Sequence, residues 1–251
     1  MIKNFRRISA LVKRDMKEIV RDPVSLGLLF ALPLAMEVLF YFIFHGLTPQ
    51  FEMNGFAPSM IGFAHAFLAL FAALLVSTDR ETAFVTRLYT TPVEAHEFVT
   101  AYELSVIPLG MLQAFLTLLC AVLIDGSIIS IRMLYLIPAC LLSIMMFASL
   151  GILAGSLFGT KAVGGISSIL ITGQSVLSGM WFPPEGLPEG FVKFMNVLPF
   201  RSLSELFRNI ITGETVSFDT VWKKVIILAA YTVGSFISAA LCFRYRSKES
   251  A

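Results

Sequence analysis

The sequence predicts an all-α integral membrane protein with six transmembrane helices, because its composition is strongly apolar and its apolar residues fall in six long runs. Of 251 residues, 57% are hydrophobic and 14% are charged, whereas soluble domains contain about 45–50% apolar residues and about 25% charged residues. A helix needs about 20 mostly apolar residues to cross a bilayer. Six windows meet this requirement: residues 24–44, 57–76, 98–124, 133–158, 162–181 and 225–243. We expect one transmembrane domain over residues 1–251, ending in a short cytoplasmic tail at residues 244–251.

Helix-breaking and polar residues interrupt some of these windows, and the first contains both Pro33 and Glu37. About twenty apolar positions, each contributing roughly −0.3 to −0.6 kcal/mol, outweigh one carboxyl group that costs roughly 2.5–3.5 kcal/mol. The window is therefore expected to insert. Pro33, Pro108 and Pro138 are expected to kink their helices without ending them, because neighbouring helices can bond the freed carbonyl groups.

The connecting segments predict the orientation, because Lys and Arg accumulate on the cytoplasmic side of membrane proteins. With six spans, 13 Lys and Arg residues fall on the side that holds both termini, and six fall on the other side. Both termini are therefore expected to be cytoplasmic.

The segment before the first span, residues 1–23, predicts an amphipathic helix that lies on the inner membrane surface. Its apolar residues recur at spacings of three and four, on a helix whose other face is basic: Phe5, Ile8, Val12, Met16 and Ile19. Such a helix is either a positively charged anchor or a contact surface for a cytoplasmic partner, and its pattern alone leaves both interpretations open.

The cytoplasmic connection at residues 77–99 combines charges with aromatic and aliphatic residues that a short solvated loop does not need. Thr91-Pro92-Val93-Glu94 resembles a capping box and predicts the start of the third span. Residues 82–89 before it are expected to form a short surface helix, which a soluble subunit could push.

The outer connection at residues 182–224 begins with a turn-rich, proline-containing stretch. Ser202-Leu203-Ser204-Glu205 is a second capping-box pattern, and Gly213 is the expected stop of the helix that follows. We predict an interfacial or re-entrant hairpin, which is too small to be an independent soluble receptor domain.

Polar residues inside the spans are candidates for function, because burying them in a membrane is costly. Glu37 and Gln174 are expected to line a substrate pathway or an inter-subunit seam, or to make structural hydrogen bonds. Gly151, Gly155 and Gly159 form a small-residue face that permits close helix packing, either within the bundle or between subunits.

Enzymatic signals are missing from the sequence. A phosphate-binding loop requires G-x-x-x-x-G-K-[ST], and Gly155-Ser156-Leu157-Phe158-Gly159-Thr160-Lys161 has the wrong spacing. Cys120, Cys140 and Cys242 lie in apolar runs without metal-ligand spacing. We expect no catalytic residues, no bound cofactor or metal and no nucleic-acid partner.

Three separated motifs resemble the membrane subunit of ABC-2-type ATP-binding-cassette exporters. Arg21-Asp22-Pro23 resembles the opening motif, and Arg80-Glu81 with Arg87-Leu88-Tyr89-Thr90-Thr91-Pro92-Val93 resembles the coupling motif between spans two and three. The third set resembles the signature after span five: Ser178-Gly179-Met180-Trp181-Phe182-Pro183, Leu187-Pro188, Leu198-Pro199 and Glu205-Leu206-Phe207-Arg208.

The resemblance implies a permease of the plasma (inner) membrane that dimerises with a second copy or a paralogue and binds two cytoplasmic ATPase subunits. ATP and magnesium would bind to those partners. Contact with the ATPase would involve a coupling set and an N-terminal set: Arg80, Glu81, Arg87, Leu88, Tyr89 and Pro92, and Arg14, Arg21, Asp22 and Pro23. The resemblance also marks an outer-hairpin set: Phe182, Pro183, Pro188, Pro199, Glu205 and Arg208.

The expected cargo is a small amphipathic molecule, a drug, as in multidrug export, or a lipid or glycolipid. A self-sufficient ion-coupled carrier that uses Glu37 is the alternative, although no internal repeat supports it. An intramembrane enzyme acting on lipids would need a polar catalytic cluster, which the sequence does not offer.

Overall fold

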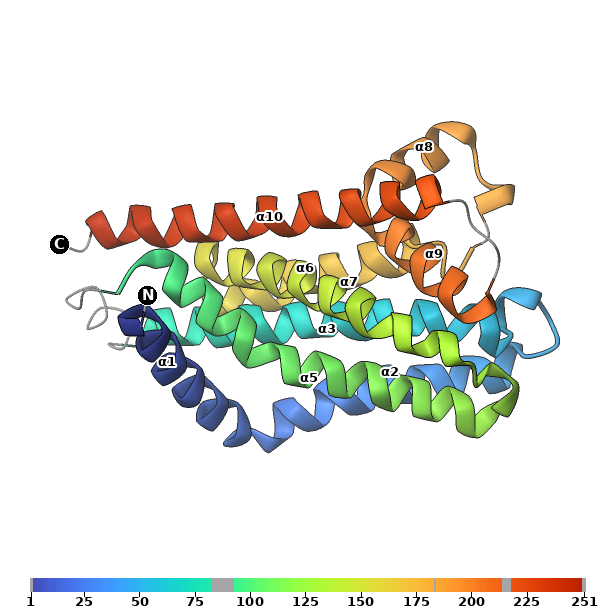
Figure 1. Cartoon of the computed structure of the whole chain (residues 1–251), viewed down its shortest axis with the longest axis horizontal. Helices are drawn as coiled ribbons and strands as arrows, with labels where there is room; N and C mark the ends of the chain where they lie inside the picture. Colours follow the sequence, from blue (N-terminus) through green and yellow to red (C-terminus); the bar gives the residue numbers. More distant parts are fainter. Residues whose placement is uncertain (1, 83–92, 183, 214–217, 250–251) are drawn as a thin grey trace.

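The computed structural model describes residues 2–82, 93–182, 184–213 and 218–249. In this part of the chain helices account for 89% of the residues and no strand is present. Long helices run side by side between two ends of an elongated bundle, and both chain termini lie at the same end (Figure 1). These long helices are α2 (Pro23–Phe44), α3 (Met53–Glu81), α5 (Ala95–Ile124), α6 (Leu136–Leu157), α7 (Thr160–Leu177) and α10 (Phe218–Glu249), whereas α1 (Ile2–Val20) lies obliquely at the end that holds both termini.

Shorter elements close the two ends of the bundle. We call the end that holds residues 2–22, 77–82, 93–98, 157–161 and 240–249 the terminal end. The opposite hairpin end holds residues 44–53, 124–136, 178–182, 184–213 and 218–221. Its short helices are η1 (Pro49–Phe51), η2 (Gly126–Ile128), η3 (Ile131–Tyr135), η4 (Pro184–Gly186), α8 (Glu189–Val197) and α9 (Pro199–Thr212).

Five of the predicted spans correspond to helices that are long and apolar enough to cross a membrane. These are Pro23–Phe44, Met53–Glu81, Ala95–Ile124, Ile131–Leu157 and Val221–Tyr245, among the described residues. The remaining window, 162–181, overlaps α7, which is not among the five because Lys161, Gln174 and several Gly and Ser residues lower the hydropathy of that helix. A sixth span therefore stays a prediction.

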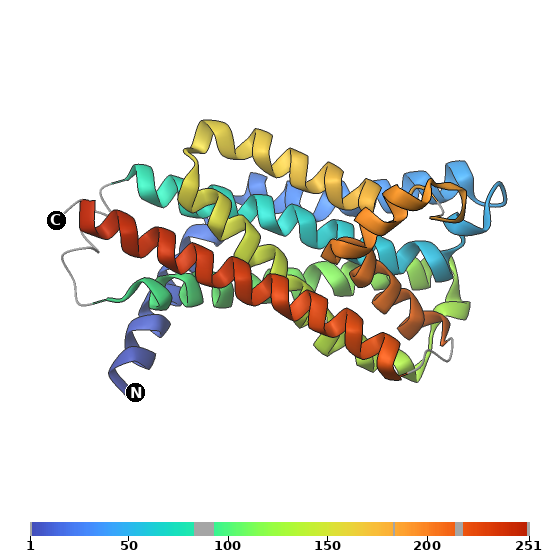
Figure 2. The same cartoon turned by 90° about the horizontal axis from the view of Figure 1, so that it is seen from above.

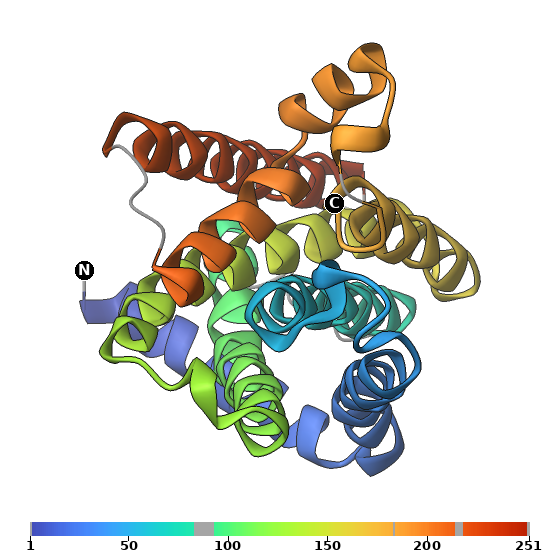
Figure 3. The same cartoon turned by 90° about the vertical axis from the view of Figure 1, so that its right-hand side faces the viewer.

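Helix α3 lies at the centre of the bundle, where it packs against α2, α5, α6 and α7 (Figure 3). Its apolar 18-residue window is 78% buried, whereas that of α2 is 17% buried. The closest approach is to α6: a Cβ atom on Gly151 would lie 2.2 Å from the Ala69 carbonyl oxygen, and one on Gly155 would lie 2.5 Å from that of Ala73. Gly151 and Gly155 therefore serve packing within the bundle, whereas the placement of Gly159 on the same helix face was wrong, because α6 ends at Leu157 and Gly159 is the N-cap of α7.

The proline residues behave differently from one another. Pro33 lies inside α2, where it cannot donate a hydrogen bond to the Leu29 carbonyl group. Gln113 of α5 donates its side-chain Nε2–H to that oxygen at 2.9 Å, as expected for a proline inside a bundle. Pro108 also lies inside a helix, α5. Pro138 lies in the first turn of α6, where no intrahelical bond is lost, so the expected kink there was wrong.

Both predicted capping boxes start at the wrong residue. Helix α5 begins at Ala95, with Glu94 as the N-cap and Glu97 completing the capping box, so Glu94 is not the third helical residue. Helix α9 begins at Pro199, so Ser202 lies inside it and does not cap it. The predicted stop at Gly213 is confirmed: Gly213 is the left-handed C-cap with φ of 70°.

The predicted amphipathic helix is present as α1, but its apolar face packs partly on the bundle. Ile19 is buried, and Leu11 and Met16 pack against the core, whereas Phe5 is exposed. Contact with the membrane surface stays a prediction for the exposed part.

Candidate functional site

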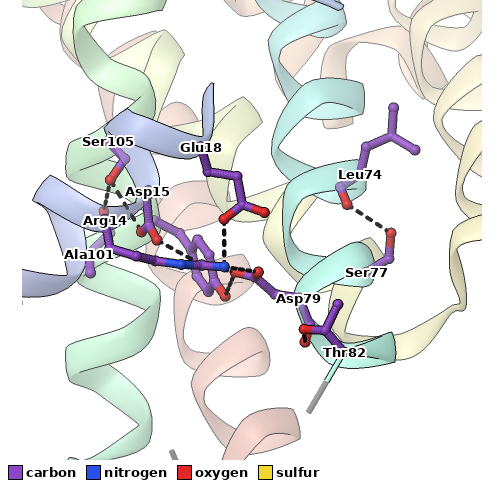
Figure 4. Close-up of polar contacts among 10 residues, drawn as sticks. Arg14, Asp15, Glu18, Leu74, Ser77, Asp79, Thr82, Ala101 and Ser105 are labelled. Carbon is purple, nitrogen blue, oxygen red and sulfur yellow. Dashed lines mark hydrogen bonds and ion pairs between the residues drawn. The ribbon is translucent and has the colours of Figure 1, made fainter. Parts of the chain in front are cut away.

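The most charged buried cluster lies at the terminal end, where α1 meets α3 and α5 (Figure 4). The Arg14 guanidinium group donates one hydrogen bond to each carboxylate oxygen of Asp79, in the last turns of α3. Tyr102 of α5 donates its hydroxyl proton to Asp79 Oδ2 at 2.7 Å. The Asp79 side chain is only 1% exposed. One carboxylate therefore connects three helices that are far apart in sequence.

Two further acidic residues of α1 surround the same guanidinium group. Arg14 Nη1 lies 3.1 Å from Asp15 Oδ1, and Arg14 Nη2 forms an ion pair with Glu18. Ser105 of α5 lies within 3.3 Å of the buried Asp15 carboxylate. We call Arg14, Asp15, Glu18, Asp79, Tyr102 and Ser105 the anchor cluster.

The surroundings in the anchor cluster raise the pKa values of its three ionisable residues on α1. Burial raises the pKa of Asp15 to about 6, although the charge and hydrogen bond of Arg14 act in the opposite direction. Burial, followed by the Asp79 charge, also raises the pKa of Glu18. Burial disfavours the charge on Arg14, but the hydrogen bond and charge of Asp79 outweigh this effect and raise its pKa.

Arg80 and Glu81 lie in the last turn of α3 and bind the connection between α6 and α7. Arg80 Nη1 donates to the carbonyl oxygens of Gly155 at 2.6 Å and Phe158 at 3.2 Å, at the C-terminal end of α6. Glu81 Oε1 accepts a 2.7 Å hydrogen bond from the Thr160 backbone N–H, at the N-terminus of α7. The cation and the anion each meet the helix end of opposite partial charge.

Arg21-Asp22-Pro23 separates α1 from α2. Asp22 Oδ1 accepts a 3.1 Å hydrogen bond from the Ser25 backbone N–H, and Pro23 is the first residue of α2. Hydrogen bonds from Ser25 lower the pKa of Asp22. In the structure the motif therefore ends one helix and caps the next.

The rest of the predicted coupling set, Arg87, Leu88, Tyr89 and Pro92, lies outside the described residues. Thr82 is the non-helical C-cap of α3. The segment between Glu81 and Val93 connects two helices that the anchor cluster joins.

Glu37 and Gln174 are both fully buried, on α2 and α7. The Cys120 thiol of α5 lies beside Glu37. Among the described residues, Gln174 has no hydrogen bond to either amide atom. A Cβ atom on Gly62 would lie 3.2 Å from Gln174 Nε2, so this amide points into the bundle toward α3.

Three other polar residues inside the spans hold helices together: His65, Glu103 and Gln113. His65, at the centre of α3, bonds Ser143 Oγ through Nδ1 at 2.8 Å and the Gly110 carbonyl oxygen through Nε2 at 3.2 Å. Ser149 of α6 donates to Glu103 of α5, and Gln113 bonds α2 as described above. A single polar residue hardly changes the mean hydropathy of a span, so hydropathy does not reveal which residues join two helices. The only signal in the sequence is that polar residues are rare inside spans.

The outer-hairpin residues cap and brace the hairpin end. Pro188 is the N-cap of α8, and Pro199 is the first residue of α9. Glu205 accepts from Arg201 Nε at 2.7 Å and lies 2.9 Å from Lys224 Nζ of α10. Burial disfavours its ionised form, but the bonds from Lys224 and Arg201 outweigh this effect and lower the Glu205 pKa.

The remaining members of the outer-hairpin set differ in their surroundings. Phe182 is 56% exposed, and Arg208 Nε is buried without a hydrogen bond among the described residues. Pro183 lies outside the described residues. Nor does the described part of the chain bring together three His, Cys, Asp or Glu side chains that could hold a metal ion.

Comparison with known families adds one finding to this geometry. The model of the ABC-2 type transporter family matches residues 6–212, a range that contains the anchor cluster, the Arg80–Glu81 contacts and the outer-hairpin set. Among curated proteins, no match was found. Because the family match covers most of the chain, the protein belongs to the ABC-2 type transporter family and is a multi-pass membrane permease, a transport subunit.

Proposed function

We propose that this permease forms the translocation pathway of an ATP-binding-cassette exporter, powered by two ATPase subunits that are separate polypeptides. Its cargo is a small amphipathic molecule, a drug or a lipid or glycolipid. The observation that carries the proposal is the anchor cluster: Arg14, Asp79 and Tyr102 join α1 to the ends of α3 and α5. A force applied to α1 or to residues 82–94 reaches both helices at once.

The Arg80–Glu81 contacts extend this path to two more helices. Arg80 bonds the end of α6, and Glu81 bonds the start of α7. In this proposal the ATPases push on residues 82–94 and on α1, and the bonded ends of α3, α5, α6 and α7 move together. Side chains at helix ends suit such a role because packed helices shift as rigid units.

We propose that the terminal end faces the cytoplasm of a cell whose plasma (inner) membrane holds the protein. Thirteen of the 19 Lys and Arg residues belong to segments assigned to that side. Helix α7 would be the sixth span, since it runs back along α3 from the terminal end to the hairpin end (Figure 2). Its 18 residues extend over about 27 Å.

The exposed face of α7 supports pairing with a second permease copy or a paralogue. Gly165, Ser168 and Thr172 are exposed on α7, and a Cβ atom on Gly165 would meet nothing within 4 Å. Ile169 is exposed on the same face, and the small and polar residues around it permit close helix packing. We infer that this face meets the partner permease or the pathway between the two.

The experiment uses the full-length chain, purified in mild detergent from membranes that contain its ATPase. The complex is expected to hydrolyse ATP, and the isolated chain is expected not to. Arg87→Glu should reduce recovery of the ATPase at least tenfold, whereas Lys193→Glu on α8 should leave it unchanged. Equal recovery with both variants would refute docking at residues 82–94, and ATP hydrolysis by the chain alone would refute the division of labour.

The alternative, an ion-coupled carrier, depends on Glu37. It requires gradient-driven transport in liposomes that contain only this chain, with loss of transport in Glu37→Gln. The exporter proposal instead expects no gradient-driven transport, and ATP-driven transport that survives in Glu37→Gln.

A further inference from the structure

A pocket at the hairpin end combines a cationic mouth with an apolar floor. It lies between η3, α6, α9 and α10 and has a volume of about 620 Å³. This volume falls within the range of about 300–1,000 Å³ that is typical of small-molecule sites. The residues that matter most in its lining are Arg132, Tyr135, Leu142, Asn209, Ile210 and Val225.

The polar and apolar parts of the pocket lie at different depths. Arg132 and Tyr135 belong to η3, at the outer edge of the bundle, whereas Leu142 lies on α6. Since α6 begins at Leu136 and runs inward, Leu142 lies about 9 Å deeper along the helix. A charged group at the mouth and an apolar chain along α6 match this arrangement.

The backbone at the mouth is adapted to the Arg132 side chain. A Cβ atom on Gly213 would lie 1.2 Å from Arg132 Nη1, and Gly213 has a φ of 70° that other residues rarely adopt. The absence of a side chain at Gly213 therefore leaves room for the guanidinium group beside the end of α9.

The acidic residue of α9 next to the pocket is already paired with cations. Glu205 is already shared by Arg201 and Lys224. Arg132 is exposed, and within the described ranges, which leave out residues 214–217, no acidic side chain forms an ion pair with it. The adjoining surface of α10 is apolar and exposed, with Ile226 at 51%, so the pocket opens sideways toward lipid.

We propose that this pocket binds one anionic phospholipid from the surrounding leaflet. Its phosphate accepts hydrogen bonds from Arg132, and one acyl chain lies along Leu142 and Val225. Charge complementarity selects an anionic headgroup, and the apolar depth requires an acyl chain as well as the phosphate. The bound lipid fills the junction of α6, α9 and α10 on the hairpin side of the permease.

Native mass spectrometry of the full-length permease tests this proposal. Protein stripped of lipid is mixed with equal amounts of phosphatidylglycerol and phosphatidylcholine, and the lipid that stays bound is counted. The wild-type protein is expected to retain one phosphatidylglycerol in preference to phosphatidylcholine. Arg132→Gln should weaken phosphatidylglycerol binding about tenfold, as expected for loss of a charge-assisted bond. Lys193→Gln on α8 removes the same charge from an exposed site and should have no effect.

The apolar half is tested separately, with the cation intact. Leu142→Trp fills the floor and should abolish retention, and Val225→Phe replaces it if the first variant does not fold. Glycerol phosphate at millimolar concentration should not displace the lipid, because it lacks the acyl chain. Equal retention of the two lipids, an equal loss in Lys193→Gln, retention in the filled pocket, or displacement by glycerol phosphate would each overturn the proposal. In that case the only role of the Arg132 side chain here is to pack against the C-terminal end of α9.

Discussion

Replacing Arg14 by Gln should release α1 from the bundle, because it leaves the Asp79 carboxylate buried without its cation. The Asp79 side chain is 1% exposed and that of Arg14 is 30% exposed. Breaking a buried ion pair from one side costs about 3–5 kcal/mol. The partial exposure of Arg14 places the expected loss at the low end, about 3 kcal/mol of unfolding free energy.

The loss should depend on pH in a defined direction. Without Arg14, three acidic groups remain close together: Asp15, Glu18 and Asp79. The pKa values of Asp15 and Glu18 are raised, and protonation of either relieves the repulsion, so the destabilisation is expected to be larger at pH 8 than at pH 5.5. Unfolding of the purified permease, titrated with denaturing detergent at both pH values, measures the difference.

Two further variants test whether the effect of Arg14→Gln comes from the lost ion pair with Asp79. Lys17→Gln removes an equal charge from an exposed position of the same helix and should change stability by less than about 0.5 kcal/mol. The double variant with Asp79→Asn should be more stable than Arg14→Gln alone, since no unpaired carboxylate is left on α3. Amide hydrogen exchange in residues 2–20 should rise in Arg14→Gln only. If Arg14→Gln exchanged and unfolded like Lys17→Gln, the anchoring role of the cluster would be refuted.

Three further predictions follow from individual contacts. Because Asp15 has its pKa raised to about 6, its ionisation opposes folding: stability is highest below its ordinary pKa and is lost as pH rises through 6, by about 1.4 kcal/mol between pH 5 and pH 7.5. Asp15→Asn should remove this slope from a pH series of unfolding free energies. Gly151→Ala should cost about 1–3 kcal/mol, because its Cβ atom would collide with a backbone carbonyl oxygen of α3, whereas Gly164→Ala, with open space around it, should be neutral in the same unfolding assay. Gln113→Leu should cost about 1–3 kcal/mol, because it leaves a carbonyl group of α2 without a donor, and hydrogen exchange around Pro33 should rise.

Each of these has a contradicting outcome. An unchanged pH slope in Asp15→Asn would place the titrating group elsewhere. Equal stabilities of Gly151→Ala and Gly164→Ala would mean that α3 and α6 are less closely packed than described. Wild-type exchange in Gln113→Leu would show that another group bonds the freed carbonyl of α2.

Hydropathy was sufficient to predict most of the bundle, because membrane insertion depends on the sum of many small contributions. The first window, 24–44, matches α2 (Pro23–Phe44), and the third, 98–124, lies within α5 (Ala95–Ile124). Helix starts were less predictable. Thr91 with Glu94 and Glu94 with Glu97 both fit the capping spacing, and only the second pair caps α5. Local pattern alone could not choose between them.

The anchor cluster could be predicted only in part. Arg14 was a candidate because the N-terminal helix resembles a contact surface, but nothing in the sequence pairs it with Asp79, 65 positions later. Because Asp79 lies at the end of a hydrophobic run, the sequence predicts a charged side chain in a solvated loop at this position. Its burial follows from the packing of α1 across α3 and α5, which is a tertiary property. Likewise, Arg80 and Glu81 were expected to face a partner, and the structure shows them bonded to α6 and α7.

The most direct test of the proposed exporter is a map of where the ATPase contacts the permease. A photoreactive phenylalanine is placed at Arg87, or at Lys193 on α8, in the full complex reconstituted in lipid vesicles. The proposal predicts that the residue at Arg87 cross-links to the ATPase in an ATP-dependent manner, and that the residue at Lys193 does not. Cross-linking at Lys193 and none at Arg87 would contradict the proposed orientation and the proposed coupling site together.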